Sequence, residues 1–451
     1  MSLSTIILAA GKSTRMLSLK SKLLFKISGD PIIDHVYRTA KSVSSNEIIC
    51  VLGDAPKELL DFVKKNKLKT VLQKKPRGTA DAVKIAIKSK AIKNNNKILI
   101  LCGDVPFISS KSLKEIIKKT NDSAICLGTT LLENPGGYGR IVRQNNNIIK
   151  IVEEKDASNK IKKINEVNTG ILCIKEGVLR KYIQKIKNNN KQKEYYLTDL
   201  VSLLSESRQK ITSFNISNEL ETMGINSKKD LVNLERKILI KKATRLLDKG
   251  VLIRDVLRTD IKGNLKVQKD VEIDINCIFE DNVSIGENTT IGHNCYLNRC
   301  KIGKNVNIKP NTIIFGATVG DNCIVGPYAR IRPGTILKNH SNIGNFVEVK
   351  NSTIGNRTRV NHLSYIGDSI LGNDINIGAG TITCNFDGKN KNKTIIEDNV
   401  FIGTNTSLIA PVIIRKNSKT GAGSVIKKNI PSNSLVVGFD RLVKSMKRKK
   451  K

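Results

Sequence analysis

Tryptophan is absent from this 451-residue sequence, and aromatic residues make up only 4% of it. Aromatic side chains that could stack on exposed bases are therefore scarce, which argues against a specialised nucleic-acid binder. No apolar run approaches the ~20 residues that a membrane-spanning helix needs. The short apolar stretch Thr5–Ala10 lacks a preceding basic segment, and we interpret it as a buried strand and not as a signal peptide. We therefore expect a cytoplasmic protein without a membrane span.

The nine cysteines include no C-x-x-C pair and no spacing typical of a metal site. We expect reduced thiols in a reducing compartment. Cys384 lies next to a candidate site residue, but we interpret it as a small buried side chain and not as a nucleophile.

Acidic residues are few relative to basic ones, 40 against 78, and the formal net charge is +38. Such a charge is typical of proteins that bind nucleic acid or a membrane surface. It is also produced by a composition rich in lysine and asparagine, and we favour this second interpretation because the lysines are spread through the whole chain. The basic tail Lys444–Lys451 is expected to be disordered.

The length indicates two or three domains. In the first half, apolar segments alternate with amphipathic ones, which predicts an α/β fold with a Rossmann-like sheet and crossover helices. The expected parallel strands are Thr5–Ala10, Ile48–Leu52, Lys97–Leu101 and Ser123–Gly128. The expected helices are Ile32–Ser42, Ala55–Lys65, Thr79–Lys88 and Ser110–Lys119.

A helical pattern then spans residues 227–250 and ends at Gly250, which predicts a linker helix. After Val271, Ile-Gly and Val-Gly pairs recur at intervals close to multiples of six. This hexapeptide period predicts a left-handed parallel β-helix in which each repeated aliphatic residue points inward. Residues Thr383–Thr394 interrupt the period and are expected to form a protruding loop.

The segment Leu8–Met16, L-A-A-G-K-S-T-R-M, follows the first expected strand and offers small residues and backbone N–H groups to a phosphate. It resembles the signature of sugar-1-phosphate nucleotidylyltransferases. Further motifs follow in the order and spacing typical of the uridylyltransferase half of the GlmU family. They are Gln73, Gly78-Thr79, Cys102-Gly103-Asp104, Gly137-Tyr138-Gly139-Arg140, Glu153-Glu154-Lys155, Glu166-Val167-Asn168-Thr169-Gly170 and Asn226.

This resemblance implies a role for each matching residue. Arg15 and Lys22 would face the phosphates as catalytic residues, and Asp104 and Asn226 would hold Mg²⁺. The uridine nucleotide would be bound by Leu8, Ala10, Gly11, Gln73, Gly78 and Thr79, with Gly103 beside them. Gly139, Glu153 and Asn168 would hold the sugar.

The second half carries one histidine in a suggestive context, His362, within N-H-L-S-Y-I-G. Its neighbouring motifs resemble the acetyltransferase half of the same family: Arg330–Gly334, Gly344–Glu348, Asn376–Gly380 and Thr383–Gly388. The resemblance implies that His362 is the general base for acetyl transfer from acetyl-CoA to glucosamine 1-phosphate. The remaining implied residues are Arg332 and Lys350 for the sugar phosphate, Tyr365, Asn376, Asn385 and Phe386 around the sugar, and Ala379, Thr404 and Ala422 for CoA.

Six positions depart from the family pattern: Ser13 and Ala80 where glycine is usual, Ser21 where proline is usual, Phe386 where tyrosine is usual, Thr404 where serine is usual, and Phe439 where arginine is frequent. The resemblance as a whole implies a uridylyltransferase at residues 1–226, a linker helix at 227–250 and a β-helix acetyltransferase with a basic tail at 251–451. The chain would first acetylate glucosamine 1-phosphate and then use UTP to make UDP-N-acetylglucosamine. It also implies a homotrimer with acetyl-transfer sites between subunits, and a product that feeds peptidoglycan and lipopolysaccharide.

Other readings of the two halves stay open at this point. The chain could make a different sugar nucleotide with a regulatory β-helix, as ADP-glucose pyrophosphorylases do, or it could be a non-catalytic regulatory protein with the same two folds. The surroundings of His362 argue against the first alternative. The presence of Lys22, Asp104, Asn226 and His362 together argues against the second.

Overall fold

A computed structural model describes residues 2–11, 14–43, 47–89, 92, 97–438 and, for the backbone alone, 441–445. The chain divides into two compact units, Met1–Lys237 and Ile238–Lys451, which are described separately. In the described residues, no helix is long and apolar enough to cross a membrane.

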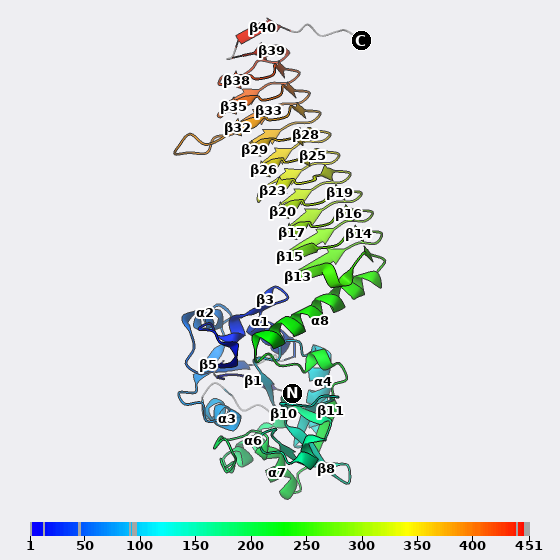
Figure 1. Cartoon of the computed structure of the whole chain (residues 1–451). Helices are drawn as coiled ribbons and strands as arrows, with labels where there is room; N and C mark the ends of the chain where they lie inside the picture. Colours follow the sequence, from blue (N-terminus) through cyan, green and yellow to red (C-terminus); the bar gives the residue numbers. More distant parts are fainter. Residues whose placement is uncertain are drawn as a thin grey trace. The chain divides into compact units, whose positions relative to one another are not determined.

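The first unit is built on a nine-stranded sheet with strand order β11-β7-β10-β6-β1-β4-β5, to which the β8–β9 hairpin is joined through β10 (Figure 1). Its strands are β1 (Leu3–Ala9), β4 (Glu47–Leu52), β5 (Lys69–Leu72), β6 (Lys97–Cys102), β7 (Ile125–Leu131), β8 (Arg140–Gln144), β9 (Asn147–Val152), β10 (Glu166–Lys175) and β11 (Ile211–Asn215). A small separate hairpin pairs β2 (Lys26–Ile27) with β3 (Asp30–Pro31). The helices are α1 (Ile32–Val43), α2 (Lys57–Lys65), α3 (Thr79–Lys88), α4 (Ser110–Lys119), α5 (Asn159–Lys162), α6 (Glu176–Ile183) and α7 (Asp199–Glu206).

The central strands β1, β4 and β6 are nearly continuous apolar runs and are buried along most of their length. This burial is typical of parallel strands whose two faces are both covered by helices. The four expected strands, β1, β4, β6 and β7, all run in the same direction, as expected. An additional strand, β10, lies between β6 and β7 and is antiparallel to both. The sheet is therefore mixed. A strand was not expected at β10 because its first five residues, Glu166–Gly170, were interpreted as a binding motif.

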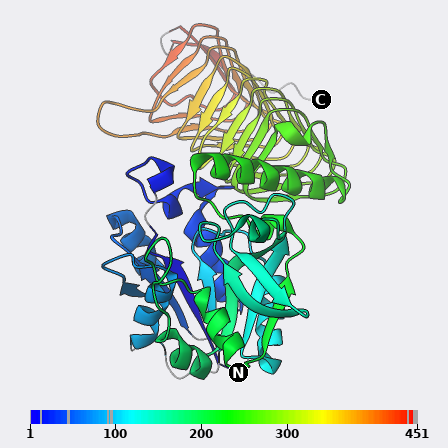
Figure 2. The same cartoon turned by 60° about the horizontal axis from the view of Figure 1, so that its bottom comes forward.

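The helix α8 (Lys228–Leu247) precedes the second unit's repeats. The repeats form a parallel β-helix, whose coils lie one above the next in Figure 2. One sheet contains β12 (Leu252–Ile253), β14 (Glu272–Ile273), β16 (Thr290–Ile291), β19 (Asn307–Ile308), β22 (Ile324–Val325), β25 (Asn342–Asn345), β28 (Arg359–His362), β31 (Asn376–Ile377), β34 (Phe401–Ile402), β37 (Lys419–Thr420), β39 (Ser434–Val437) and β40 (Arg441–Ser445).

The other seventeen strands form the remaining faces of the coils. They are β13 (Thr259–Val267), β15 (Cys277–Ile285), β17 (Tyr296–Asn298), β18 (Lys301–Ile302), β20 (Ile313–Phe315), β21 (Thr318–Val319), β23 (Arg330–Ile331), β24 (Ile336–Leu337), β26 (Glu348–Lys350), β27 (Thr353–Ile354), β29 (Tyr365–Gly367), β30 (Ser369–Leu371), β32 (Ile382–Cys384), β33 (Thr394–Ile396), β35 (Ser407–Ile409), β36 (Val412–Ile414) and β38 (Val425–Ile426).

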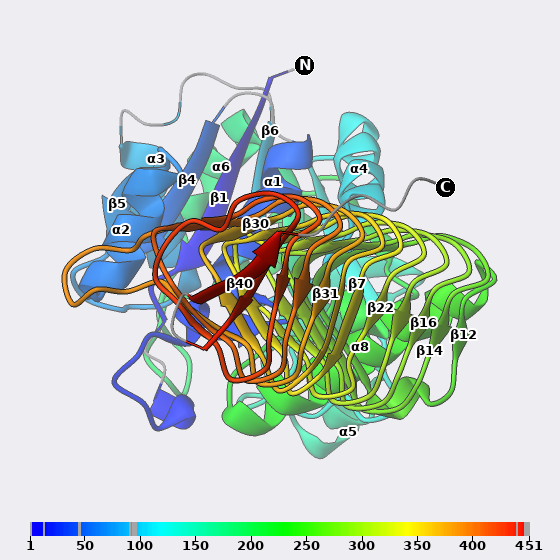
Figure 3. The same ribbon diagram turned by 90° about the horizontal axis from the view of Figure 1, so that it is seen from above.

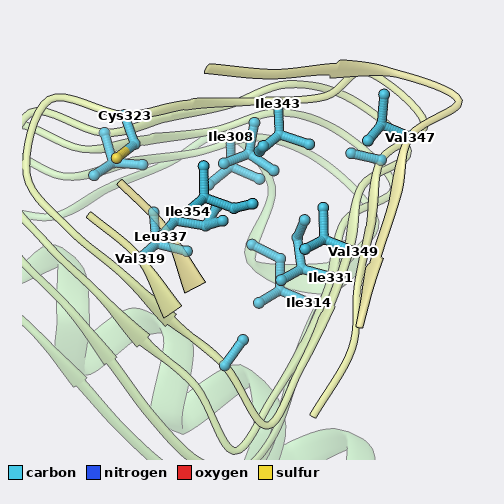
Figure 4. Packing of buried hydrophobic residues seen from close by; sticks show 14 of the residues in the cluster. Ile308, Ile314, Val319, Cys323, Ile331, Leu337, Ile343, Val347, Val349 and Ile354 are labelled. Atoms are coloured by element: carbon cyan, nitrogen blue, oxygen red, sulfur yellow. The ribbon is translucent and has the colours of Figure 1, made fainter. Parts of the chain in front are cut away.

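The hexapeptide prediction is confirmed by the burial of the repeated aliphatic residues. Figure 4 shows how side chains such as Ile331, Leu337, Ile343 and Val349 point into the interior of the coil, and each is at most 1% exposed. Stacking them in columns gives one continuous apolar core, so each coil is stabilised mainly by its neighbours. The predicted interruption is also confirmed, because residues 385–393 leave the coil between β32 and β33 as the projecting loop seen in Figure 3.

Candidate active sites

The first candidate site lies where β1 and β6 end at the same edge of the sheet. The strands are parallel, with Leu8 beside Cys102 in the register, and ligands of α/β sheets bind beyond such carboxyl ends. The Gly103 amide donates to the Leu8 carbonyl at 2.9 Å, and a Cβ at Gly103 would lie 2.9 Å from that oxygen. Glycine therefore allows this close packing, and the next residue, Asp104, follows directly at the edge.

Two hollows of about 440 and 530 Å³ open here, and both are lined by Leu8, Arg15, Thr79, Cys102 and Asp104. The first hollow also has Gly139, Glu153, Asn168 and Asn226 in its wall. The second also has Ala10, Gly11, Lys22, Gln73 and Gly78. The structure thus brings together every residue expected at this site, with Gly103 directly behind the wall. Burial raises the pKa of the Cys102 thiol to about 12, so this cysteine is an uncharged part of the wall.

Lys22 connects the two residues that were expected to hold a metal ion. Its Nζ lies 2.5 Å from Asp104 Oδ2 and 3.2 Å from Asn226 Oδ1. The side chains of Lys22 and Asp104 are only 13% and 23% exposed. A carboxylate oxygen and an amide oxygen, from positions far apart in the chain, therefore converge on one positive charge, as the oxygen ligands of a hard cation must.

Asp230 supports Asn226 and was not identified from the sequence as a site residue. Its Oδ2 accepts from the Asn226 amide at 3.1 Å and from the Ser227 amide at 2.9 Å. The Ser227 hydroxyl oxygen accepts in turn from the Asp230 amide at 3.2 Å. This reciprocal arrangement is a capping box, and the spacing S-x-x-D before an apolar helix would have been the signal for it.

The second hollow is shaped by a glycine in the left-handed region at the start of α3. Gly78 has φ +111°, and a Cβ there would lie 2.5 Å from the Tyr195 carbonyl oxygen. The buried Gln73 amide donates to the Gly78 carbonyl at 3.2 Å and to Asp81 Oδ2 at 2.8 Å. The Thr79 hydroxyl oxygen accepts from the Leu197 amide at 3.0 Å. These contacts join the α3 turn to the segment before α7 and hold the wall of the hollow in place.

The first hollow contains a carboxyl group in an unusual environment. Burial raises the pKa of Glu153, the hydrogen bond from Thr198 opposes this, and the nearby Asp199 and Asp156 charges add to it. Thr198 Oγ1 donates to Glu153 Oε1 at 2.9 Å. Across the hollow, the Asn168 amide donates to the Gly139 carbonyl at 2.8 Å, so the three residues expected at the sugar lie around one space.

The second candidate site lies on the β-helix around His362, which is exposed at the end of β28. In the parallel register, Asn345 of the preceding coil lies beside His362, and its Oδ1 is 2.9 Å from the ring Nδ1. With the amide oxygen as acceptor, Nδ1 carries the hydrogen and Nε2 is left with a free electron pair. This arrangement suits a general base.

The two cationic side chains expected at this site lie on the coils before the one that carries His362: Lys350 pairs with Gly367 of β29, and the Arg332 amide donates to the Val349 carbonyl. Arg332 Nη1 lies 2.6 Å from Glu348 Oε1, and Lys350 Nζ lies 3.8 Å from Asp368 Oδ2. Lys391 was not identified from the sequence, because it stands in the irregular loop; its pKa is lowered first of all by Lys350. The loop thus places the Lys391 ammonium group near that of Lys350.

Asp368 anchors the loop that carries Asn385 and Phe386. It accepts from Asn351 Nδ2 at 2.6 Å and also from Asn385 Nδ2. Burial opposes its ionisation, but these two hydrogen bonds and the Lys350 charge outweigh burial and lower the pKa of Asp368. Phe386 itself is 61% exposed. Cys384, expected to be buried, is half-buried, and burial raises the pKa of its thiol.

The residues expected to bind CoA form a column of small side chains along successive coils. The Asn405 amide donates to the Ala379 carbonyl, and the Gly423 amide donates to the Thr404 carbonyl, both at 2.7 Å. Ala379, Thr404 and Ala422 therefore occupy equivalent corners of three coils. Asn376 pairs with Arg359 of the coil that carries His362, and Tyr365 pairs with Glu348. Ser13 and Phe439, as well as the side chain of Arg441, lie outside the described residues.

Comparison with known proteins gives a consistent result for both units. A nucleotidyl transferase family model matches residues 4–220, a model of six bacterial transferase hexapeptide repeats matches residues 393–428, and a GMPPB C-terminal domain model matches residues 261–340. The bifunctional protein GlmU of Acinetobacter baylyi is 42% identical over 441 residues, which cover 98% of this chain and 96% of that protein. A solved Bacillus anthracis protein, described as a glucose-1-phosphate thymidylyltransferase in complex with sucrose, is 19% identical and covers 52% of this chain and 94% of its own, with a TM-score of 0.43. That last likeness is too distant to support an inference.

Proposed function

The chain belongs to the GlmU family of bifunctional transferases, and from this membership we propose a chemical role for each of its two sites. The protein is an enzyme of UDP-N-acetylglucosamine biosynthesis with a nucleotidyltransferase unit and a hexapeptide acetyltransferase unit. The observation that supports the assignments in the nucleotidyltransferase unit is that the expected residues other than Gly103 line two hollows with shared walls, although they are scattered through the sequence. In the acetyltransferase unit, the supporting observation is the contact between His362 Nδ1 and Asn345 Oδ1.

In the acetyltransferase unit, His362 Nε2 accepts a proton from the 2-amino group of glucosamine 1-phosphate. The neutral amine attacks the carbonyl carbon of acetyl-CoA, and the proton that His362 accepts is the one that the nitrogen releases as the C–N bond forms. The C–S bond then breaks, and the protonated imidazole gives this proton to the leaving thiolate. Asn345 acts through the histidine, because its amide oxygen holds the Nδ1–H tautomer.

The substrate groups of this reaction fit the side chains around His362. Arg332 and Lys350 bind the sugar phosphate, and the neighbouring Lys391 adds a further positive charge. Tyr365, Asn376 and Asn385 position the sugar, with Phe386 at its edge. Ala379, Thr404 and Ala422 line the CoA site, where small side chains leave backbone groups accessible.

In the nucleotidyltransferase unit, the phosphate of N-acetylglucosamine 1-phosphate attacks the α-phosphorus of UTP and pyrophosphate leaves. Arg15 and Lys22 face the phosphates, and Asp104 with Asn226 would hold Mg²⁺. Two oxygen ligands suffice because Mg²⁺ in such sites is completed by substrate phosphates and water. When bound, the ion supplies charge neutralisation for phosphoryl transfer.

The rest of the first site divides between the two substrates. Leu8, Ala10, Gly11, Gln73, Gly78 and Thr79 bind the uridine nucleotide, with Gly103 supporting the wall. Gly139, Glu153 and Asn168 bind the N-acetylglucosamine part. We assign the enzyme to the cytoplasm, where its product would supply peptidoglycan and lipopolysaccharide synthesis.

The whole proposal is tested by incubating the purified chain with glucosamine 1-phosphate, acetyl-CoA, UTP and Mg²⁺ and following the products by mass spectrometry. We expect UDP-N-acetylglucosamine, free CoA and pyrophosphate. N-acetylglucosamine 1-phosphate as the final product would contradict the role of the first site, and the absence of any product would favour a regulatory protein.

Glu153 makes sugar binding in the first site sensitive to pH. The ionised carboxylate accepts hydrogen bonds from sugar hydroxyls, and its pKa is raised, so protonation weakens binding as the pH falls. Because the pKa is raised, we expect the KM for N-acetylglucosamine 1-phosphate to begin rising at a pH above that expected for an ordinary glutamate, whose pKa is about 4.3. Glu153→Gln should give a high KM that no longer depends on pH over this range. A wild-type KM that stays constant down to the ordinary pKa would contradict this role.

A homotrimer is the quaternary state that we propose, and an apolar ladder near His362 supports it. Tyr328, Phe346 and Leu363 stand at matching corners of successive coils with φ between +47° and +56°, a costly conformation for bulky residues. They are 53–61% exposed, and the first two rings stack with centroids 5.3 Å apart. Such a contiguous apolar surface is typical of an interface between chains.

The trimer is tested by sedimentation. We expect the wild-type protein to have three times the 49.8 kDa mass of one chain. Phe346→Ser should shift the population towards monomers, whereas Leu257→Ser, at a 60% exposed leucine elsewhere in the second unit, should leave it unchanged. A monomeric wild-type protein would rule the trimer out.

A further inference from the structure

One arginine near the first site is buried although its charge does not face the hollow. Arg140 begins β8 and its side chain is only 2% exposed. Arginine is almost never buried without a partner, and here Nη2 lies 2.7 Å from Glu154 Oε2. Burial opposes ionisation of Glu154, but the hydrogen bond and charge of Arg140 outweigh this effect and lower the pKa of the carboxyl. The pair is therefore ionised at neutral pH.

This ion pair also holds the loop Gly136–Gly139, whose four residues all line the first hollow. Arg140 Nη1 donates to the Tyr138 carbonyl, and Glu154 Oε2 accepts from the Gly137 amide at 3.3 Å. Side-chain packing does not constrain the first two residues of the loop, because a Cβ at Gly136 or Gly137 would meet no atom within 4 Å. The hydrogen bonds to the pair therefore link Gly137 and Tyr138 to the β8–β9 hairpin.

The same pair fixes the direction of the chain at Glu153. Glu154 follows Glu153 directly, but the two side chains have different surroundings. Glu153 lines the hollow, whereas Glu154 forms the ion pair with Arg140. The β8–β9 register places Arg140 beside Val152, the residue before Glu153. One contact therefore connects the glycine loop to the segment that carries Glu153, and the two are close, since a Cβ at Gly139 would lie 3.4 Å from Glu153 Oε2.

We propose that Arg140 and Glu154 are a positioning pair for the sugar subsite of uridylyl transfer. They touch no substrate; they hold the Gly136–Gly139 backbone and the Glu153 carboxylate at the separation that N-acetylglucosamine 1-phosphate requires. This inference rests on the proposed assignment of the first hollow to that sugar. It predicts an effect on one substrate of the reaction and not on the other, because the nucleotide residues Gln73 and Gly78 lie in the second hollow.

The test measures steady-state uridylyl transfer with Glu154→Gln and Glu154→Ala. Because small misplacements of a binding group are costly, we expect the KM for N-acetylglucosamine 1-phosphate to rise about tenfold or more, while the KM for UTP stays near the wild-type value. Glu154→Gln keeps an oxygen that can accept from Gly137, so it carries the test if the alanine variant does not fold.

A control exists on α6 of the same unit. Arg180 Nε lies 2.7 Å from Glu176 Oε1, the Glu176 side chain is only 8% exposed, and neither residue lines a hollow. Glu176→Gln removes this ion pair and should leave both KM values unchanged. A general loss of stability would affect both substrates, so the difference between the two KM values separates positioning from folding.

The Asn168→Ala variant distinguishes failure of the positioning role from failure of the assignment of the first hollow to the sugar. An unchanged sugar KM in the Glu154 variants, with a raised one in Asn168→Ala, would overturn the positioning role and keep the sugar assignment. An unchanged KM for the sugar in the Glu154 variants and in Asn168→Ala would overturn the assignment of the first hollow to the sugar, and the positioning role with it. Equal increases for sugar and UTP in the Glu154 variants would also overturn the positioning role.

Discussion

His362→Ala is expected to lower kcat for acetyl transfer about 10²–10⁴-fold, the usual contribution of a general base. The loss should be confined to this reaction, because uridylyl transfer from supplied N-acetylglucosamine 1-phosphate uses residues of the other unit. Release of free CoA thiol measures the first activity and release of pyrophosphate the second. The pyrophosphate assay also reports whether the first unit of the variant is folded, and circular dichroism compares the β-helix of the variant with that of the wild type.

Two further variants sharpen this result. His340→Ala removes another exposed histidine of the β-helix, at a corner that carries none of the proposed site residues, and should leave acetyl transfer unchanged. Asn345→Ala removes the acceptor of the Nδ1 hydrogen, so it should reduce kcat by less than His362→Ala does. Acetyl transfer that persists at near wild-type rate without His362 would rule out its role as the base.

Asp104→Asn is expected to reduce uridylyl transfer about 10²-fold or more, the size typical of losing one group that stabilises transition-state charge. The substitution keeps the size of the side chain and removes the negative charge that meets Lys22 at 2.5 Å. Acetyl transfer should not change. The measurement is pyrophosphate release as a function of Mg²⁺ concentration, where we expect the variant to require more Mg²⁺ for its residual activity.

The chain contains a close control for this substitution. Gly53-Asp54 follows β4 just as Gly103-Asp104 follows β6, and the two strands both pair in parallel with β1. A Cβ at Gly53 would lie 2.8 Å from the Ala10 carbonyl oxygen, so the local packing is similar. Asp54→Asn should leave uridylyl transfer unchanged. If both substitutions caused the same loss, a specific role for Asp104 would be untenable.

The pattern of the repeats was sufficient to predict the β-helix. In such a fold each coil contacts mainly its neighbours, so the period in the sequence is the period of the structure. The inward positions of Ile343 and Ile354 follow directly from this periodicity. The loop at 385–393 was visible for the same reason, because it breaks the period, but its Lys391 could not be placed beside Lys350 without the coordinates.

The mixed sheet shows the limit of local patterns. A buried strand has the same apolar composition whether its neighbour is parallel or antiparallel, so nothing in Glu166–Lys175 indicated that β10 inserts between β6 and β7. The buried Arg140 was hidden for a related reason. Its charge and its glycine neighbours are typical of an exposed turn, and only the approach of Glu154 from the other strand of the hairpin explains its burial.

The pairs Gly53-Asp54 and Gly103-Asp104 show what the local sequence predicts and what depends on contacts between distant segments. Residue order alone indicates that each pair ends a buried strand, because the apolar run stops there and glycine permits a close turn. It does not indicate which aspartate meets a cation, and the choice of Asp104 depended on resemblance to a family. In the structure, Lys22 and Asn226 converge on Asp104, while Asp54 is exposed. Local physics places strands and turns, whereas a binding site requires side chains from distant segments, and the packing of the whole unit is what brings those segments together.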